Sequence, residues 1–195
     1  MSTPRNRTVG AVLLTPGAGS SASHSSLVAL EVALAPLPVA RVDFPYRREG
    51  RKAPDRAPKL IACVREEAAT LAASAGVDAS RVVLGGRSMG GRMCSLAVAE
   101  GLPAAGLVLI SYPLHPPGKP DQLRTAHFQQ IDVPCLFVSG ERDAFGSRDE
   151  FDAHVPQVRG RVTQVWVPRA GHDLKGHDAT IVAAVQDWLR AESLI

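Results

Sequence analysis

The feature that most restricts the fold of this chain is the alternation of short, mainly apolar runs with longer segments of helical character. Runs of four to six residues, most of them without a regular polar alternation, are typical of strands buried on both faces of a sheet. Six such runs are expected to be strands: Val9–Leu14, Val39–Phe44, Arg81–Leu84, Leu107–Ile110, Cys135–Val138 and Val162–Val167. Helices are expected at Leu27–Leu34, Leu60–Ala75, Met89–Glu100, Gln122–Gln129 and Asp178–Ala191.

This order predicts an α/β fold, in which a six-stranded, mainly parallel sheet lies between two layers of helices. The length of 195 residues suits a single domain spanning 1–195. The segment Tyr112–Val133 between the fourth and fifth strands is short, so we expect no cap domain over the sheet.

Composition excludes several classes of function. A net charge of +3 does not establish the basic face of a nucleic-acid-binding protein, and we expect no nucleic-acid partner. The N-terminal MSTPRNR is followed by no apolar segment long enough for a signal peptide or a membrane span, so no membrane partner is expected. Cys63, Cys94 and Cys135 have no metal-site spacing, and we interpret them as reduced, buried residues of a cytoplasmic protein that holds no metal.

The strongest local signal is the sequence Gly85–Gly91, GGRSMGG, between the third strand and the following helix. It contains G-x-S-x-G in a strand-turn-helix setting, which is the context that gives this short motif its meaning. Such a turn presents a serine hydroxyl clear of the sheet, and glycines are required where a Cβ would collide as strand and helix converge. Ser88 is therefore the candidate nucleophile.

A serine hydroxyl requires a base, and the base requires a carboxylate that orients it. Asp143 follows the fifth strand and His172 follows the sixth, so both lie at the carboxyl edge of the sheet, in the chain order serine, acid, histidine. The other candidates are Glu141 and Asp149 for the acid, and His154 and His177 for the base.

Two backbone N–H groups are needed to stabilise the oxyanion of an acyl-transfer reaction. Met89, which follows the nucleophile, supplies one candidate. The loop TPGAG after the first strand supplies the other, and the glycines beside Ala18 make its amide the best choice.

These stretches resemble an α/β-hydrolase of the dienelactone-hydrolase-like kind. The similarity is greatest to a group that contains a testis-expressed hydrolase-like protein and the hydrolase-like subunit of the NSL histone-acetyltransferase complex. It runs from residue 15 to residue 174 through TPGAG, VDFPYR, GGRSMGGR, SYPLHPPGKP, SGERDAFG and AGHDL. One departure is Pro16, which stands where many α/β-hydrolases have a histidine.

The resemblance implies a minimal hydrolase fold that lacks the usual leading hairpin, uses no cofactor, and employs Ser88, Asp143 and His172 as nucleophile, acid and base. The triad chemistry predicts that the substrate is a small carboxylic ester or thioester, with amide, lactone and perhydrolysis chemistry as the alternatives.

Two other classes of function are considered. The first is nicotinamide-dinucleotide binding, because Gly17–Ala22 matches G-x-G-x-x-A after a strand and Asp43 ends the next strand. The second is a non-catalytic binding or scaffold protein on a hydrolase fold, as the subunit of the acetyltransferase complex illustrates.

Some residues are candidates for substrate contact: Gly17, Tyr46, Arg47 and His115. The segment 46–59 carries six Lys or Arg residues against two carboxylates, a local net charge of +4, which is either a solvated loop or a region that attracts an acidic substrate. His24 and His127 are interpreted as structural or surface residues, and Cys94 as a packing residue.

Overall fold

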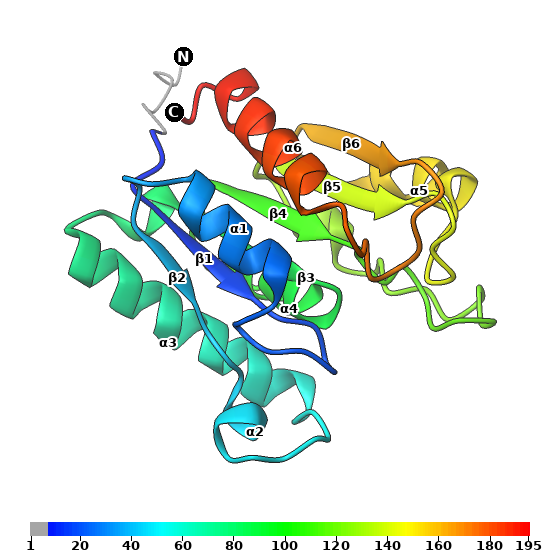
Figure 1. Cartoon of the computed structure of the whole chain (residues 1–195), viewed down its shortest axis with the longest axis horizontal. Coiled ribbons are helices and arrows are strands. Elements are labelled where there is room, and N and C mark those ends of the chain that lie inside the picture. Colours follow the sequence, from blue (N-terminus) through cyan, green and yellow to red (C-terminus); the bar gives the residue numbers. More distant parts are fainter. Residues whose placement is uncertain (1–7) are drawn as a thin grey trace.

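The computed structural model describes residues 8–195, and these residues form a sheet of six parallel strands in the order β2-β1-β3-β4-β5-β6 (Figure 1). The strands are β1 (Ala11–Thr15), β2 (Val39–Arg41), β3 (Val82–Arg87), β4 (Gly106–Ile110), β5 (Cys135–Gly140) and β6 (Val162–Val167). The helices are α1 (Ser25–Ala33), α2 (Pro45–Arg48), α3 (Ala57–Ala75), α4 (Met89–Ala99), α5 (Arg148–His154) and α6 (Asp178–Ala191). Short 3-10 helices are η1 (Ala79–Arg81), η2 (Phe128–Gln130) and η3 (Val155–Gln157).

The sheet separates two hydrophobic cores, because successive side chains of a strand point to opposite faces. Leu13 of β1 and Leu84 of β3 belong to the core under α3 and α4. Their neighbours Val12 and Val83 belong to the core under α1 and α6. Figure 1 shows these two helix pairs on opposite faces of the sheet. The predicted three-layer α/β architecture is therefore confirmed.

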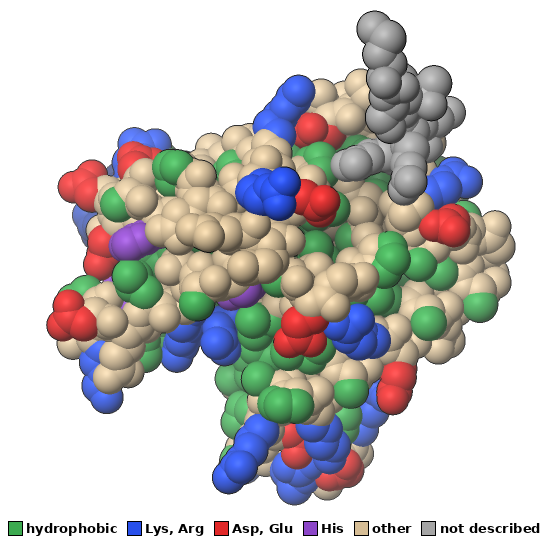
Figure 2. Space-filling model, turned by 180° about the vertical axis from the view of Figure 1, so that it is seen from behind, with side chains coloured by type: hydrophobic (Ala, Val, Ile, Leu, Met, Phe, Trp, Pro, Cys, Tyr) green, Lys and Arg blue, Asp and Glu red, His purple; other side chains and the backbone are tan. Residues whose placement is uncertain are grey.

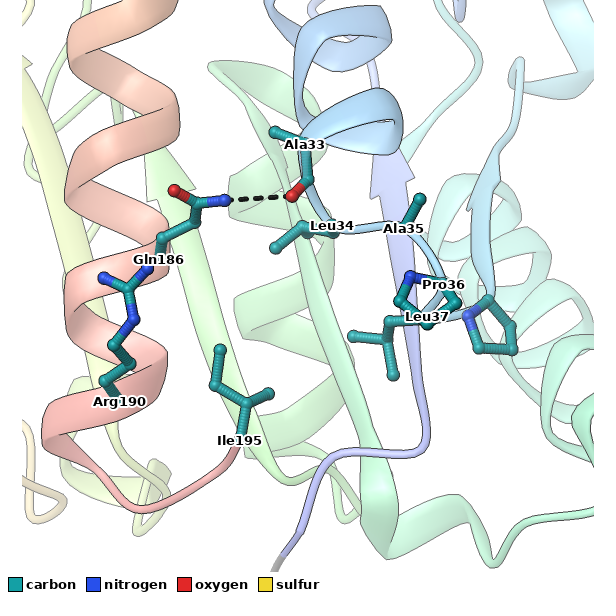
Figure 3. A pocket seen from close by; sticks show the side chains of 9 residues that line it. Ala33, Leu34, Ala35, Pro36, Leu37, Gln186, Arg190 and Ile195 are labelled. Atoms are coloured by element: carbon teal, nitrogen blue, oxygen red, sulfur yellow. Dashed lines mark hydrogen bonds between the residues drawn. The ribbon is translucent and has the colours of Figure 1, made fainter.

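A side-chain hydrogen bond connects the helices α1 and α6 at the end of the molecule that lies away from the carboxyl edge of the sheet. The Gln186 side chain donates a hydrogen bond of 2.9 Å to the carbonyl of Ala33, in the last turn of α1, where a helix leaves carbonyls unpaired (Figure 3). An apolar hollow of about 530 Å³ lies beside this contact, lined by Leu34, Pro36 and Ile195 among others. It includes none of the candidate catalytic residues.

The strand order places the candidate site. β1 lies directly beside β3, while the chain leaves β1 toward β2 and leaves β3 toward β4. This is a topological switch point, where open α/β sheets bind their ligands beyond the carboxyl ends of the strands. The loops after β1 and β3 meet there, and they are the two loops that carry the candidate oxyanion donors and Ser88.

Some sequence predictions are wrong. Gln122–Gln129 is not a helix, since only Phe128–Gln130 forms a 3-10 turn. Hydrogen bonds from the Arg124 N–H to the Leu114 carbonyl and from the Tyr112 hydroxyl to the Arg124 carbonyl hold this segment as an irregular loop instead. The sequence predicts no helix between residues 45 and 59, but this segment contains α2 and the first turn of α3.

The N-terminal segment MSTPRNR, which we considered as a possible targeting segment, lies outside the described residues. Within residues 8–195, every helix is either too short or too polar to cross a bilayer.

Candidate active site

Ser88 stands at the tip of a sharp turn between β3 and α4. Its backbone has φ +48° and ψ −116°, a conformation that side-chain-bearing residues rarely adopt, and its N–H donates to the Ile110 carbonyl at 2.8 Å. A Cβ on Gly86 would lie 2.2 Å from Thr15 Oγ1, and one on Gly90 would lie 2.5 Å from the Pro16 carbonyl oxygen. The glycines are therefore required by close approach of the turn to the β1 loop.

The structure brings Ser88, His172 and Asp143 into one chain of hydrogen bonds. His172 Nε2 lies 2.9 Å from Ser88 Oγ. On the other side of the ring, Nδ1 lies 2.8 Å and 3.0 Å from the two carboxylate oxygens of Asp143. The Asp143 side chain is almost fully buried, with 2% exposed, whereas the His172 side chain keeps 25% of its surface.

The direction of these hydrogen bonds follows from their chemistry. A carboxylate only accepts, so the Asp143 side chain fixes the His172 proton on Nδ1. The Nε2 lone pair then faces Ser88 and accepts the hydroxyl proton. This is the protonation state that a general base requires.

Phe145 supports both partners of the serine. Its backbone N–H donates to Asp143 Oδ1 at 2.8 Å. Its ring stacks on the His172 imidazole with centroids 3.9 Å apart and planes inclined by 27°. Sequence reasoning did not single out Phe145, although it lies two residues after the predicted acid.

The Arg87 side chain binds the backbone of the loop that carries His172. Its guanidinium donates to the carbonyl of Asp173 at 2.6 Å and of His172 at 3.3 Å, and it also contacts Nε2 of His24. On the other side of the His24 ring, Nδ1 accepts from the Ser26 N–H at 3.3 Å and lies 3.0 Å from Ser26 Oγ. Burial lowers the pKa of both side chains, and the Arg87 charge lowers that of His24 further.

Sequence reasoning also missed Arg87, although one signal was available. Arg87 ends a strand that is buried throughout, and a charge in that position requires partners.

The loop after β1 carries the second candidate oxyanion donor. Among the described residues, neither the Ala18 nor the Met89 backbone N–H donates to another group, so both are available. A Cβ on Gly17 would lie 3.5 Å from the Ser88 Cβ, which places this loop directly against Ser88. The Tyr46 hydroxyl donates to the Ala18 carbonyl at 2.8 Å, and Tyr46 is fully buried. Tyr46 therefore anchors the loop.

The dinucleotide alternative depends on the same loop. The carboxylate of Asp43, its candidate ribose ligand, accepts instead from the Ala22 N–H at 2.8 Å. The following helix α1 begins only at Ser25, capped by His24. Gly17 thus packs against the Ser88 turn, and a Cβ on Gly19 would meet nothing within 4 Å, so neither glycine opens a helix.

The other candidate acids and bases lie apart from this chain of hydrogen bonds. Glu141 accepts from the Arg169 N–H at 3.2 Å, and Asp149 lies in the first turn of α5. His154 ends α5, and His177 precedes α6 as its N-cap residue. His115 is buried with Nε2 3.2 Å from a Glu150 carboxylate oxygen.

Three of the six basic side chains of the segment 46–59 form ion pairs with its own or neighbouring carboxylates. Arg48 pairs with Glu67, while Arg51 and Lys59 pair with Glu49 and Asp55. Figure 2 shows basic and acidic side chains mixed at this lower end of the molecule. Arg47 forms no ion pair with the described residues, and its charge lowers the pKa of Tyr46, although burial raises that pKa overall.

A second serine–histidine pair lies further along α4. Ser95 Oγ and His127 Nε2 are 2.8 Å apart. The Ser95 hydroxyl donates a hydrogen bond to the Arg92 carbonyl at 2.8 Å, so the imidazole is the donor to the serine oxygen. This arrangement cannot activate Ser95.

The three cysteines are buried and unpaired. Burial raises the pKa of the Cys94 thiol to about 12, which favours a packing role over a reactive one. Among residues 8–195, no three His, Cys, Asp or Glu side chains are grouped so as to hold a metal ion.

Comparison with known proteins places this geometry in context. The sequence profile described as "Alpha/beta hydrolase domain" matches residues 8–193. Among solved structures, Est1E from Butyrivibrio proteoclasticus is 16% identical with a TM-score of 0.76, covering 97% of this chain and 91% of its own. A dienelactone hydrolase from Anabaena variabilis is 19% identical with a TM-score of 0.74, covering 94% and 87%. An alpha-beta serine hydrolase homologue from Coxiella burnetii is 17% identical with a TM-score of 0.74, covering 94% and 88%.

Proposed function

The chain belongs to the alpha/beta hydrolase domain family, and from this premise we propose that it is a serine hydrolase that cleaves a carboxylic ester or thioester through an acyl-enzyme on Ser88. The observation that carries the proposal is the continuous hydrogen-bonded chain from Asp143 through His172 to Ser88. Its direction leaves the histidine lone pair on the serine hydroxyl, as nucleophilic attack requires.

In the proposed reaction, Ser88 Oγ attacks the substrate carbonyl while His172 Nε2 takes the hydroxyl proton. Asp143 stabilises the imidazolium that forms, and the Ala18 and Met89 amides donate to the oxyanion. His172 then protonates the leaving alcohol or thiol. A water molecule, deprotonated by the same histidine, releases the acid and restores Ser88.

Arg87 and Tyr46 act in this proposal as positioning residues. Arg87 fixes the backbone carbonyls of His172 and Asp173, and thereby the height of the imidazole above Ser88. Tyr46 fixes the carbonyl of Ala18, whose own N–H is the proposed oxyanion donor. Neither side chain needs to touch the substrate for these roles.

The resemblance of motifs such as GGRSMGGR and SYPLHPPGKP supports a finer placement, in the group with the testis-expressed protein and the acetyltransferase subunit. The three buried, unpaired cysteines support a cytoplasmic location. Both placements are part of the proposal.

The function is tested by pre-steady-state hydrolysis of p-nitrophenyl acetate and of a short acyl thioester. An acyl-enzyme predicts nitrophenolate release with a burst near one equivalent when deacylation is slow, and an intact mass raised by one acetyl group. A folded protein that gives neither turnover nor acylation with either substrate would instead support the non-catalytic scaffold alternative.

Arg47 is proposed to attract an anionic substrate, because its charge is not neutralised by a described carboxylate. We expect Arg47→Gln to lower kcat/KM for an ester with a free carboxylate by about twofold to fivefold at low salt, and to leave a neutral ester unchanged. Arg48→Gln is the matched control, since Glu67 already pairs with Arg48. Equal effects of both variants on both esters would remove Arg47 from the proposal.

A further inference from the structure

A second hollow lies on the face of the molecule covered by α4, between that helix and the segment 123–130. It measures about 410 Å³, which falls within the range of sites for small molecules. It follows α4 from Arg92 to Glu100, a distance of about 12 Å at the rise of an α-helix. Ser88 precedes this stretch, and no triad residue lines the hollow.

One end of the hollow carries two arginines without acidic partners. Within residues 8–195, neither Arg92 nor Arg124 forms an ion pair, whereas Arg48, Arg51 and Arg65 all do. Burial lowers the pKa of Arg124, and the neighbouring charge of Arg92 lowers it further. The Nε group of Arg92 is buried without a hydrogen-bond partner. Two half-buried like charges repel each other, and an anion bound between them would relieve this repulsion.

The other polar groups of the hollow do not compensate this charge. Glu100 lines the opposite end, and its carboxylate is 3.3 Å from Arg65. His127 is neutral at physiological pH, because burial and the Arg92 charge lower its pKa to about 4. Gln130 is uncharged. The positive end of the hollow therefore lacks its counter-charge.

The rest of the lining is apolar. Leu96 and Ala99 contribute it from α4, and Leu123 from the facing segment, where 40% of the Leu123 surface is exposed. A bare inorganic anion would leave this surface in water. An anion with an apolar body would cover it while its charged group reached the guanidinium groups.

We propose that this hollow binds a small amphipathic anion, with its carboxylate or phosphate group on Arg92 and Arg124 and its apolar body against Leu96, Ala99 and Leu123. The site is distinct from the Ser88 site and does not depend on the function proposed for it.

Isothermal titration tests the site with four probes: octanoate, octyl phosphate, inorganic phosphate and octanol. Saturable binding of octanoate or octyl phosphate, with weaker binding of inorganic phosphate and of octanol, supports the proposal, and the tighter of the two amphiphiles identifies the head group. Arg124→Gln and Arg92→Gln should each weaken that binding about tenfold or more, the loss of one charge-assisted hydrogen bond. Arg56→Gln, which removes an exposed arginine far from the hollow in the sequence, should leave it unchanged.

Thermal unfolding provides a second measurement, which also compares the wild type and the variant in the absence of any probe. Without a probe, Arg124→Gln should melt no lower than the wild type, because it relieves repulsion. With the amphiphile, the wild type should gain several degrees and Arg124→Gln markedly less. Equal affinity in Arg92→Gln, Arg124→Gln and Arg56→Gln, or no saturable binding of any anion, would overturn the proposal. Inorganic phosphate binding as tightly as octyl phosphate would overturn the apolar part of it.

Discussion

The two serines at the start and in the middle of α4 each lie beside a histidine, and only one of these pairs has the arrangement of a catalytic pair. Ser88 and Ser95 are separated by about two turns of α4. Their distances to a histidine Nε2 are nearly equal, at 2.9 Å for His172 and 2.8 Å for His127. Distance alone therefore does not distinguish a nucleophile from a structural hydroxyl.

The difference lies in the groups behind each pair. Asp143 accepts a hydrogen bond from the Nδ1–H of His172, so the Nε2 lone pair faces Ser88. Within residues 8–195, no carboxylate forms a hydrogen bond with His127, and burial together with the nearby charge of Arg92 disfavours its protonation. An arginine lies near each of the two histidines. Arg87 donates a hydrogen bond to the backbone carbonyl of His172, whereas the charge of Arg92 lowers the pKa of the His127 ring. The comparison teaches that the direction of proton donation, set by these neighbours, decides which serine can react.

The largest expected effect separates the two serines. Ser88→Ala should lower kcat for ester hydrolysis by on the order of 10⁴-fold or more, because it removes the nucleophile. Ser95→Ala should leave kcat within about twofold, since that hydroxyl only bridges His127 and a helix carbonyl. Steady-state kinetics with p-nitrophenyl acetate measures both variants, and equal losses would mean that the two pairs do not differ as described.

The next effect concerns the carboxylate that only the first pair has. Asp143→Asn should reduce kcat by about 10³–10⁴-fold, because an amide can donate to Nδ1 and so stabilise the wrong tautomer of His172. Glu141→Gln, which alters a neighbouring carboxylate on the Arg169 N–H, is the matched control and should retain full activity. Retained activity in Asp143→Asn would assign the orienting role to another residue.

A smaller loss is expected when the His172 loop is no longer held. Arg87→Met should lower kcat about tenfold to a hundredfold with little change in KM, because it leaves two backbone carbonyls without their donor. Arg87→Lys keeps the charge and one donor group, so it should recover part of kcat. If the two variants lose stability equally but keep wild-type kcat, Arg87 is purely structural.

The smallest expected effect is on the free energy of unfolding, and it tests whether the buried His127 resists protonation. The pKa of His127 is about 4 in the folded protein against an ordinary value of 6.5, so the folded state binds fewer protons between these values. Stability should therefore fall as the pH drops from about 6.5 to about 4. His127→Gln does not titrate and keeps a donor for Ser95, so it should lose about 2 kcal/mol less than the wild type over this window, after allowance for partial exposure. Urea unfolding at pH 7 and pH 4.5 measures the difference, and parallel losses would show that His127 does not resist protonation.

The sequence was sufficient to predict the layers of the fold and the residues that meet at the carboxyl edge. Alternating elements predict a parallel sheet, and the carboxyl ends of parallel strands necessarily share one edge, so Ser88, Asp143 and His172 could be expected together. The irregular conformation of the segment 112–133 could not be predicted from the sequence, because hydrogen bonds such as that from Tyr112 to Arg124 depend on tertiary packing rather than on local preference.

The supporting contacts of the site were also beyond sequence reasoning. Arg87 binds carbonyls that lie 85 and 86 residues away in the chain, and Tyr46 binds one 28 residues away. Backbone carbonyls occur at every position, so no residue type marks the acceptor that a given side chain will find. Such contacts emerge only once the loops are placed.

The central claim is that Ser88, and not Ser95, is the activated serine. It is tested most directly by treating the folded protein with a fluorophosphonate and identifying the modified peptide by mass spectrometry. We expect one label per chain, on Ser88, with Ser95 unmodified and with labelling lost in His172→Ala. A label on Ser95, a label that persists undiminished in His172→Ala, or a folded protein that remains unlabelled would contradict it.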